Sequence, residues 1–270
     1  MVTMDNTLGK VITIVEQVIP KDLSETWDNC GMQVGDADWP VEKIWVALDP
    51  LPEVITAASQ SDVDLVITHH PLIFRPLKTV DVKTPEGTVI QQALKGKVAV
   101  YSAHTNLDRV QAGVNDVLAE SIDLQDIAPL SIDPVSGKPG FGRIGKVAPP
   151  LPPTELISRL KAAFKLEHVK VAGDLNLSIQ AVVVCSGSGS SMIPEFFKSN
   201  ADAFISGDLH YHDARLFEFA GKVLIDIGHF VSEHLIVEAL TDCLKRKFRS
   251  EGLKLDVEAY AFEKDPFLMV

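Results

Sequence analysis

Two adjacent histidines, His69 and His70, stand directly after a short apolar run in the stretch VITHHPLIF, residues 66–74. Adjacent side chains on extended backbone point to opposite sides. The two imidazoles therefore cannot share one core pocket, but each could bind one of two neighbouring metal ions. An isolated pair of this kind would indicate only a half-buried histidine beside a surface one, because imidazole is intermediate in burial. The rest of the chain favours the metal interpretation.

Further metal-ligating residue types follow three more predicted strands. His229 and Glu233 are spaced i, i+4 at the start of a predicted helix, so both side chains can face one point. Nitrogen and oxygen donors without thiolate suit zinc, manganese, iron(II) or nickel better than calcium. The side chains concerned are His104 and Asp108 after one strand, Asp208, His210 and His212 after another, and His229 and Glu233 after the last.

This set of residues suits hydrolytic chemistry. Two metal ions close together could activate a water molecule near neutral pH. Histidine titrates near working pH, so His104 or His212 could act as a general acid or base. Asp208, His210 and His212 could line the wall of the pocket or, equally well, form a solvated loop that caps the following helix. The SGSGSS loop, residues 186–191, lacks the lysine of a P-loop and therefore indicates a tight strand-to-helix turn.

Strands that alternate with helices must position these residues. Strands predicted near 44–48, 65–67 and 98–102 are separated by helices, which indicates a largely parallel sheet. Ligands of such open sheets bind just outside the carboxyl ends of the strands, where the histidine pair stands. Thr84 followed by proline marks a helix start. The alternation of apolar and polar residues over 253–261 predicts a final strand at a sheet edge.

The residue pattern changes over residues 126–145, where Pro, Gly and Ser separate short strand-like pieces. This change predicts that the chain crosses into a second lobe. We therefore expect an α/β protein with two similar lobes and mostly parallel or mixed sheets. Residues 1–125 plus 222–270 would form the first lobe and 126–221 the second. Each lobe contains a strand–helix–strand unit of similar spacing, which is a weak sign of duplication because α/β proteins produce such pairs by chance.

The composition excludes several classes of protein. A formal charge of −12 argues against direct binding of nucleic acid, although bound metal ions could still attract phosphorylated small molecules. The three cysteines are too few and too scattered for a disulfide framework. No apolar run approaches the ~18 residues of a membrane span, and no signal peptide opens the chain. We therefore expect a cytoplasmic protein without membrane association.

Six motifs together resemble the Nif-three-like family, whose members are often labelled GTP cyclohydrolase I type 2. They occur in the family's order and cover nearly the whole chain: WDNCGMQVGD, VITHHPLIF, YSAHTNLD, VCSGSGSS, SGDLHYHDA and DIGHFVSEH. The resemblance implies two α/β lobes with a dinuclear metal site in the cleft between them, and a ring-shaped homohexamer. At this length the chain resembles the short form, without an inserted domain.

Carried onto this sequence, the resemblance implies five ligands for two divalent metal ions: His69, His70, Asp108, His229 and Glu233. His104 would lie near the metals as a supporting group or proton carrier. We expect a metal-dependent hydrolase acting on a small-molecule substrate, for which a nucleotide such as GTP is one candidate. The alternative is a metal-binding scaffold or regulatory ring protein without turnover. Open metal positions would favour the enzyme, and fully closed coordination a structural site.

Overall fold

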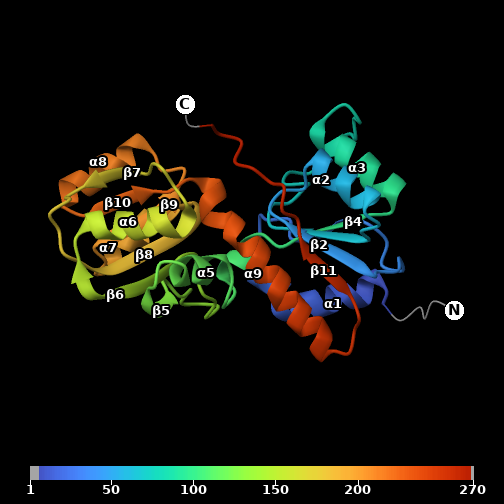
Figure 1. Cartoon of the computed structure of the whole chain (residues 1–270), viewed down its shortest axis with the longest axis horizontal. Helices are drawn as coiled ribbons and strands as arrows, with labels where there is room; N and C mark the ends of the chain where they lie inside the picture. The colour runs from blue at the N-terminus through green and yellow to red at the C-terminus, as the bar shows by residue number, and fades with distance from the viewer. Residues whose placement is uncertain (1–5, 269–270) are drawn as a thin grey trace. The chain divides into compact units, whose positions relative to one another are not determined.

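The computed structural model describes residues 6–268, which divide into two compact units. Within this range, the first unit comprises residues 6–110 and 236–264, and the second comprises 111–235 and 265–268. Each unit contains one β-sheet covered by helices (Figure 1). The α/β architecture with two sheets that the sequence predicts is therefore confirmed.

The sheet of the first unit has five strands in the order β1-β4-β3-β2-β11. Its four parallel strands are β2 (Lys43–Ala47), β3 (Leu65–Thr68), β4 (Ala99–Ser102) and β11 (Asp256–Ala259). The antiparallel strand β1 (Gly31–Val34) pairs with β4 at one edge. The sequence pattern predicts the parallel strands, including β11 at the other edge, but it does not predict β1.

Helices cover both faces of this sheet. α2 (Pro52–Gln60) and α3 (Pro85–Gly96) pack on one face, where their apolar side chains join one core with residues of β2, β3 and β4. α1 (Leu8–Val18) and the part of α9 (His229–Ser250) that belongs to this unit lie on the other face (Figure 1). Thr84 caps α3 as predicted, because its side chain accepts a hydrogen bond from a backbone N–H of the first turn.

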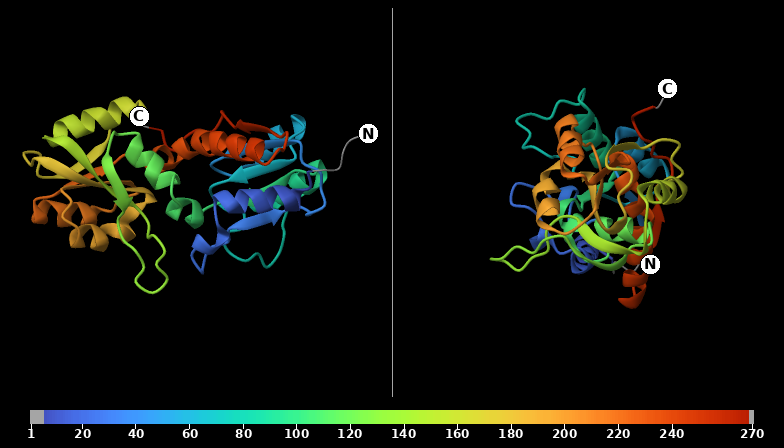
Figure 2. Two further views of the ribbon diagram at one scale, coloured as in Figure 1. Left: turned by 90° about the horizontal axis from the view of Figure 1, so that it is seen from below. Right: turned by 90° about the vertical axis from the view of Figure 1, so that its left-hand side faces the viewer.

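The sheet of the second unit is mixed, with six strands in the order β5-β6-β8-β9-β10-β7. The central strands β8, β9 and β10 are parallel, β6 and β7 pair with them antiparallel, and β5 pairs antiparallel with β6. The strands are β5 (Gln125–Pro129), β6 (Arg143–Leu151), β7 (Lys170–Gly173), β8 (Ile179–Ser188), β9 (Ala203–Gly207) and β10 (Val223–Asp226). Figure 2 shows the segment between β5 and β6 as a long loop that extends away from this sheet.

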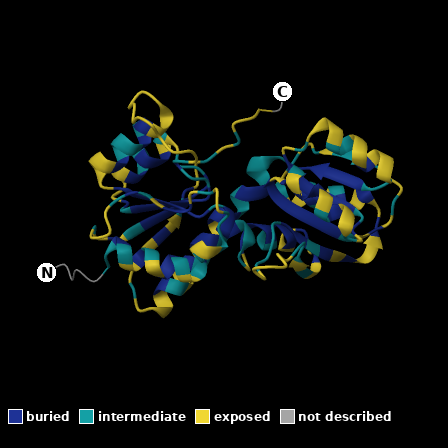
Figure 3. Ribbon diagram, turned by 180° about the vertical axis from the view of Figure 1, so that it is seen from behind, coloured by how far each residue is buried: buried dark blue, intermediate teal, exposed yellow. Residues whose placement is uncertain are grey.

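Alternate residues of the central strands pack against two different helical layers. In β8, Val182 and Val184 join the core formed with α5 (Val114–Glu120) and α6 (Pro153–Phe164). Val183 and Cys185, which point the other way, pack with α7 and α8. These two helices span Ile193–Lys198 and Tyr211–Ala220. Figure 3 shows the resulting pattern, with buried strands and exposed outer faces of the helices.

The division into units differs from the predicted lobe boundaries at 125 and 222, which assign α5 and β10 to the first lobe. In the structure α5 packs on β8, and β10 pairs with β9 and β7, so both elements belong to the second unit. Composition marks where loops occur, but it does not show which sheet an element joins.

Three short helices complete the described chain: the 3-10 helices Lys21–Leu23 and Gly189–Met192, and α4 (Thr105–Arg109). Among residues 6–268, none of the helices is both long enough and apolar enough to cross a membrane.

Candidate metal centre

Three histidine rings of the first unit lie together at the carboxyl ends of two parallel strands. His69 and His70 follow β3 and His104 follows β4, and the strand ends are in register, with Thr68 opposite Ser102. The ring centroid of His69 lies 5.1 Å from that of His70 and 5.2 Å from that of His104. One ring nitrogen from each histidine lies within 4.8 Å of the other two. The group is compact enough to hold a metal ion.

Asp108 joins this cluster through α4, a short helix that the sequence pattern does not predict. α4 begins directly after His104, and the backbone N–H of Asp108 donates to the His104 carbonyl at 3.1 Å. Asp108 Oδ1 lies 3.8 Å from His69 Nε2. This separation is too long for a hydrogen bond. Two ligand atoms that bind the same ion, each about 2.0–2.2 Å from that ion, can lie this far apart.

His229 and Glu233 open α9 just after β10, in the second unit. His229 Nε2 lies 2.9 Å from Glu233 Oε2, so the i, i+4 spacing does bring both side chains to one point. The Glu233 side chain is only 6% exposed, whereas that of His229 is 34% exposed. Burial of a carboxylate is stabilised by positive charge, and a cation bound by both side chains would supply it.

Gly187, near the end of β8 in the SGSGSS segment, leaves room for this carboxylate. Its backbone has a φ of +61°, and a Cβ at this position would overlap Glu233 Oε1 and lie 3.4 Å from His229 Nε2. The Gly187 N–H donates to Ser232 Oγ at 2.8 Å, which fixes the end of β8 against the first turn of α9. Residues 186–191 pass directly from β8 into the 3-10 helix Gly189–Met192, in keeping with the predicted tight strand-to-helix turn, and Gly187 lies beside the two proposed ligands.

Each of the four clustered or paired histidines has an oxygen acceptor at Nδ1. A backbone carbonyl or an ionised carboxylate can only accept, so Nδ1 carries the proton, and Nε2 is the atom through which such a ring would bind a metal ion. In His229, Nε2 faces the Glu233 carboxylate at 2.9 Å, and a bound ion would lie between these two groups. Metal-binding histidines almost always show this arrangement. The pairs are His69 with Ala103 O at 2.9 Å, His70 with Asp49 Oδ1 at 2.7 Å, His104 with Asp28 Oδ1 at 3.0 Å and His229 with Asp208 Oδ2 at 2.8 Å.

Asp49 and Asp208 hold equivalent positions in the two sheets. Asp49 follows β2, the parallel neighbour of β3, and Asp208 follows β9, the parallel neighbour of β10. Each carboxylate therefore stands beside a histidine that follows the next strand. Asp208 adopts a φ of +50°, a left-handed conformation in which aspartate is enriched. Sequence reasoning missed Asp49, although its place directly after the strand IWVAL could have indicated it.

Asp28 supports His104 from a buried position. Besides His104 Nδ1, its carboxylate accepts hydrogen bonds from the Thr105 backbone N–H at 3.1 Å and from Cys30 Sγ at 3.0 Å. Burial alone would raise the pKa of Asp28, but the hydrogen bonds from His104, Cys30 and Thr105 outweigh it and hold this pKa well below its usual range. Asp28 therefore stays ionised and fixes the orientation of the His104 ring.

His210 and His212 lie at the start of α8. His210 is the N-cap of α8 and forms a capping box with Asp213, and its Nδ1 lies 2.9 Å from Ser190 Oγ. His212 is exposed, and its ring packs edge-on against Tyr211 with centroids 5.4 Å apart. The capping interpretation of His210 therefore fits the structure.

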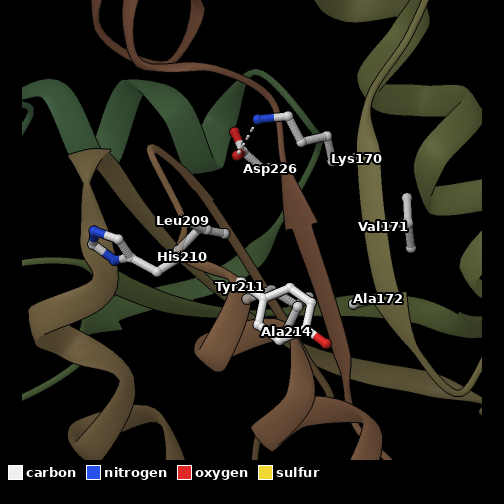
Figure 4. Close-up of a pocket in the computed structure, with 9 residues that line it drawn as sticks. Lys170, Val171, Ala172, Leu209, His210, Tyr211, Ala214 and Asp226 are labelled. Carbon is white, nitrogen blue, oxygen red and sulfur yellow. Dashed lines mark hydrogen bonds and ion pairs between the residues drawn. The ribbon is translucent and has the colours of Figure 1, made fainter.

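A cavity of about 220 Å³ lies between β7 and α8, and His210 is one of its lining residues (Figure 4). Its charged residues, Lys170 and Asp226, form an ion pair with a separation of 3.3 Å. Asp226 also accepts a hydrogen bond from the Gly228 N–H at 2.9 Å. The two charged side chains of this cavity are thus paired with each other.

The chain is similar along nearly its whole length to one group of proteins. The profile of the Duf34/NIF3 (NGG1p interacting factor 3) family matches residues 6–266. A protein of Clostridium perfringens named GTP cyclohydrolase 1 type 2 homolog is 35% identical over 262 residues, which cover 96% of this chain and 98% of that protein. The resemblance inferred from the six motifs is therefore confirmed.

Solved structures show the same fold. A Bacillus cereus protein related to NIF3 has a TM-score of 0.91 at 23% identity, covering 98% of this chain and 99% of that one. Reduced HcgD from Methanocaldococcus jannaschii has a TM-score of 0.80 at 30% identity, covering 95% and 98%.

Proposed function

Because the chain belongs to the Duf34/NIF3 family, we propose that it is a hydrolase that depends on two divalent metal ions. The proposed ligands are His69, His70, Asp108, His229 and Glu233. Zinc, manganese, iron(II) and nickel suit these nitrogen and oxygen donors. Curated relatives carry the name GTP cyclohydrolase 1 type 2 homolog, and GTP is therefore the first substrate to test.

The common orientation of the histidines is the observation that most strongly supports metal binding. In His69, His70 and His229 the Nδ1 atom is engaged by a carbonyl or carboxylate oxygen, which leaves Nε2 as the metal-binding atom.

The residues of the chain have separate tasks in this proposal. Bound divalent ions would polarise an electrophilic group and lower the pKa of water to about 7. Asp49 and Asp208 orient the imidazoles of His70 and His229, so that these rings bind without reorganisation. The buried carboxylate of Glu233 offsets part of the added positive charge.

His104 is the proposed proton carrier. Asp28 holds its Nδ1–H, so Nε2 is the atom that can accept or donate a proton. The ring also contacts those of His69 and His70, which places it beside proposed ligands. His212 stays the alternative acid or base.

Formate release from GTP tests the activity. Hydrolytic opening of the purine ring should release formate from metal-replete protein, and a chelator should abolish the release. Absence of formate with all four candidate metals would exclude this reaction, and a broader hydrolase screen would then test the class. Intact metal binding without turnover on any substrate would favour the scaffold alternative. The homohexamer and the cytoplasmic location stay predictions, and the mass in solution tests the former.

A further inference from the structure

Two large aromatic side chains are exposed beside the histidine cluster of the first unit. Trp27 is 58% exposed and Phe74 is 48% exposed. Their ring centroids lie 5.9 Å apart, and they lie 6.4 Å and 6.1 Å from the centroid of His104. The three interplanar angles are 74°, 78° and 83°, so each ring stands steeply against the other two. The rings thus form an open corner with His104 as one wall.

Hydrogen bonds tie together the two loops that carry these aromatic rings. Asn29 Nδ2 donates to the Ile73 carbonyl at 2.7 Å, and Gln33 Oε1 accepts from the Ile73 N–H at 3.2 Å. The two amide side chains also bond to each other at 3.0 Å. Asp28, next to Trp27, is fixed by its buried hydrogen bonds. The backbone beside each ring is therefore anchored although the rings themselves are exposed.

An anchored pair of exposed rings differs from a single exposed apolar side chain. Isolated cases, such as Phe219 at 92% exposure, are normal on protein surfaces and indicate nothing. Ligand sites combine aromatic walls with a few fixed polar groups, and rigid walls lose little freedom on binding. Aromatic side chains bind nucleobases through stacking and edge contacts, because every base has a π-face.

We propose that Trp27 and Phe74 bind the base of a nucleotide substrate and hold it beside His104. This inference rests on the proposed function, since it names the substrate class of the same site. The formal charge of −12 makes the protein surface itself a poor site for a phosphate. A neutral base that packs on aromatic rings avoids this repulsion, and the phosphate would rely on bound cations.

Calorimetric titration of the full-length, metal-loaded protein tests the inference with two probes, GMP and ribose 5-phosphate. The probes share ribose and phosphate, so their difference in affinity isolates the base. GMP should bind more tightly. Trp27→Ala and Phe74→Ala should each weaken GMP binding by about 5–150-fold and leave ribose 5-phosphate binding unchanged. Trp27→Phe should retain most of the affinity, and Phe219→Ala is the control for removal of an exposed ring.

Equal affinity for the two probes, or unchanged GMP binding in both alanine variants, would overturn the inference. A lower mass in solution for Trp27→Ala would also overturn it, because the rings would then form an interface between copies of the chain. The titration needs no turnover. Preference for GMP without any hydrolase activity would contradict the proposed function alone, whereas hydrolase activity with equal binding of both probes would contradict this inference alone.

Discussion

Replacing Gly187 by alanine tests whether Glu233 binds metal without altering any proposed ligand. The new Cβ would overlap Glu233 Oε1 and lie 3.1 Å from the carboxylate carbon. An ordinary contact of about 3.5 Å requires the carboxylate to move by roughly 1 Å. Because it is the end of a flexible side chain, this movement costs little folding energy.

The effect on metal binding should be much larger than the effect on folding. Metal–ligand distances tolerate shifts of only about 0.2 Å, so a displaced carboxylate loses its bond. We expect the affinity for metal to fall by at least about 10–100-fold, the usual loss when the support of a ligand is removed. The left-handed backbone at Gly187 adds about 1–2 kcal/mol of destabilisation for alanine.

Gly221→Ala is the matched control. Gly221 has a φ of +62°, almost the same as Gly187, but its Cβ would meet no atom within 4 Å. Both variants should therefore lose similar stability in thermal unfolding, and only Gly187→Ala should lose affinity in competition with a chromogenic chelator. Equal metal affinity of the two variants would refute the role of Glu233 as a ligand.

Three further substitutions give separate predictions. Glu233→Gln keeps the shape of the side chain but removes its charge, so elemental analysis should find less bound metal than in the unmodified protein. His104→Ala should leave metal content and mass in solution nearly intact while turnover falls by roughly 10²–10⁴-fold, and full activity on an identified substrate would exclude the proton-carrier role. Burial raises the pKa of Asp202, but hydrogen bonds from two backbone N–H groups and from Lys222 outweigh it, so the net pKa is lowered. The ionised carboxylate therefore stabilises the fold above about pH 4, and this stabilisation is lost as the pH falls through the depressed pKa. Asp202→Asn should therefore reduce the free energy of unfolding by about 1–3 kcal/mol at pH 7, and a difference that does not shrink as the pH is lowered from 4 would contradict this reasoning.

The spacing of apolar residues and the residues that cap helices or form turns predict much of the fold, because both are local signals. The apolar run before His69 gives β3, and the Thr84-Pro sequence gives the start of α3. β1 is not predicted because the turn signals of the WDNCGMQVGD motif, Asn29-x-Gly31 and Gly35-Asp36, lie at its two ends. α4 is not predicted either, because five residues are too few to show a helical period.

The residues that contact the proposed ligands are harder to predict, because these contacts form between segments that are far apart in the sequence. Nothing in the residues around Asp49 shows that its carboxylate meets His70 at 2.7 Å. That contact follows from the parallel register of β2 and β3. In the same way, Gly187 is 46 residues from Glu233 in sequence, and only the fold shows that a side chain there would displace the carboxylate.

Metal analysis of the purified, metal-loaded protein tests the central claim most directly. If His69 and His70 belong to a centre with two ions, the protein should contain close to two equivalents of metal per chain, and His70→Ala should lower this content. A content of one equivalent that His70→Ala leaves unchanged would contradict the dinuclear centre.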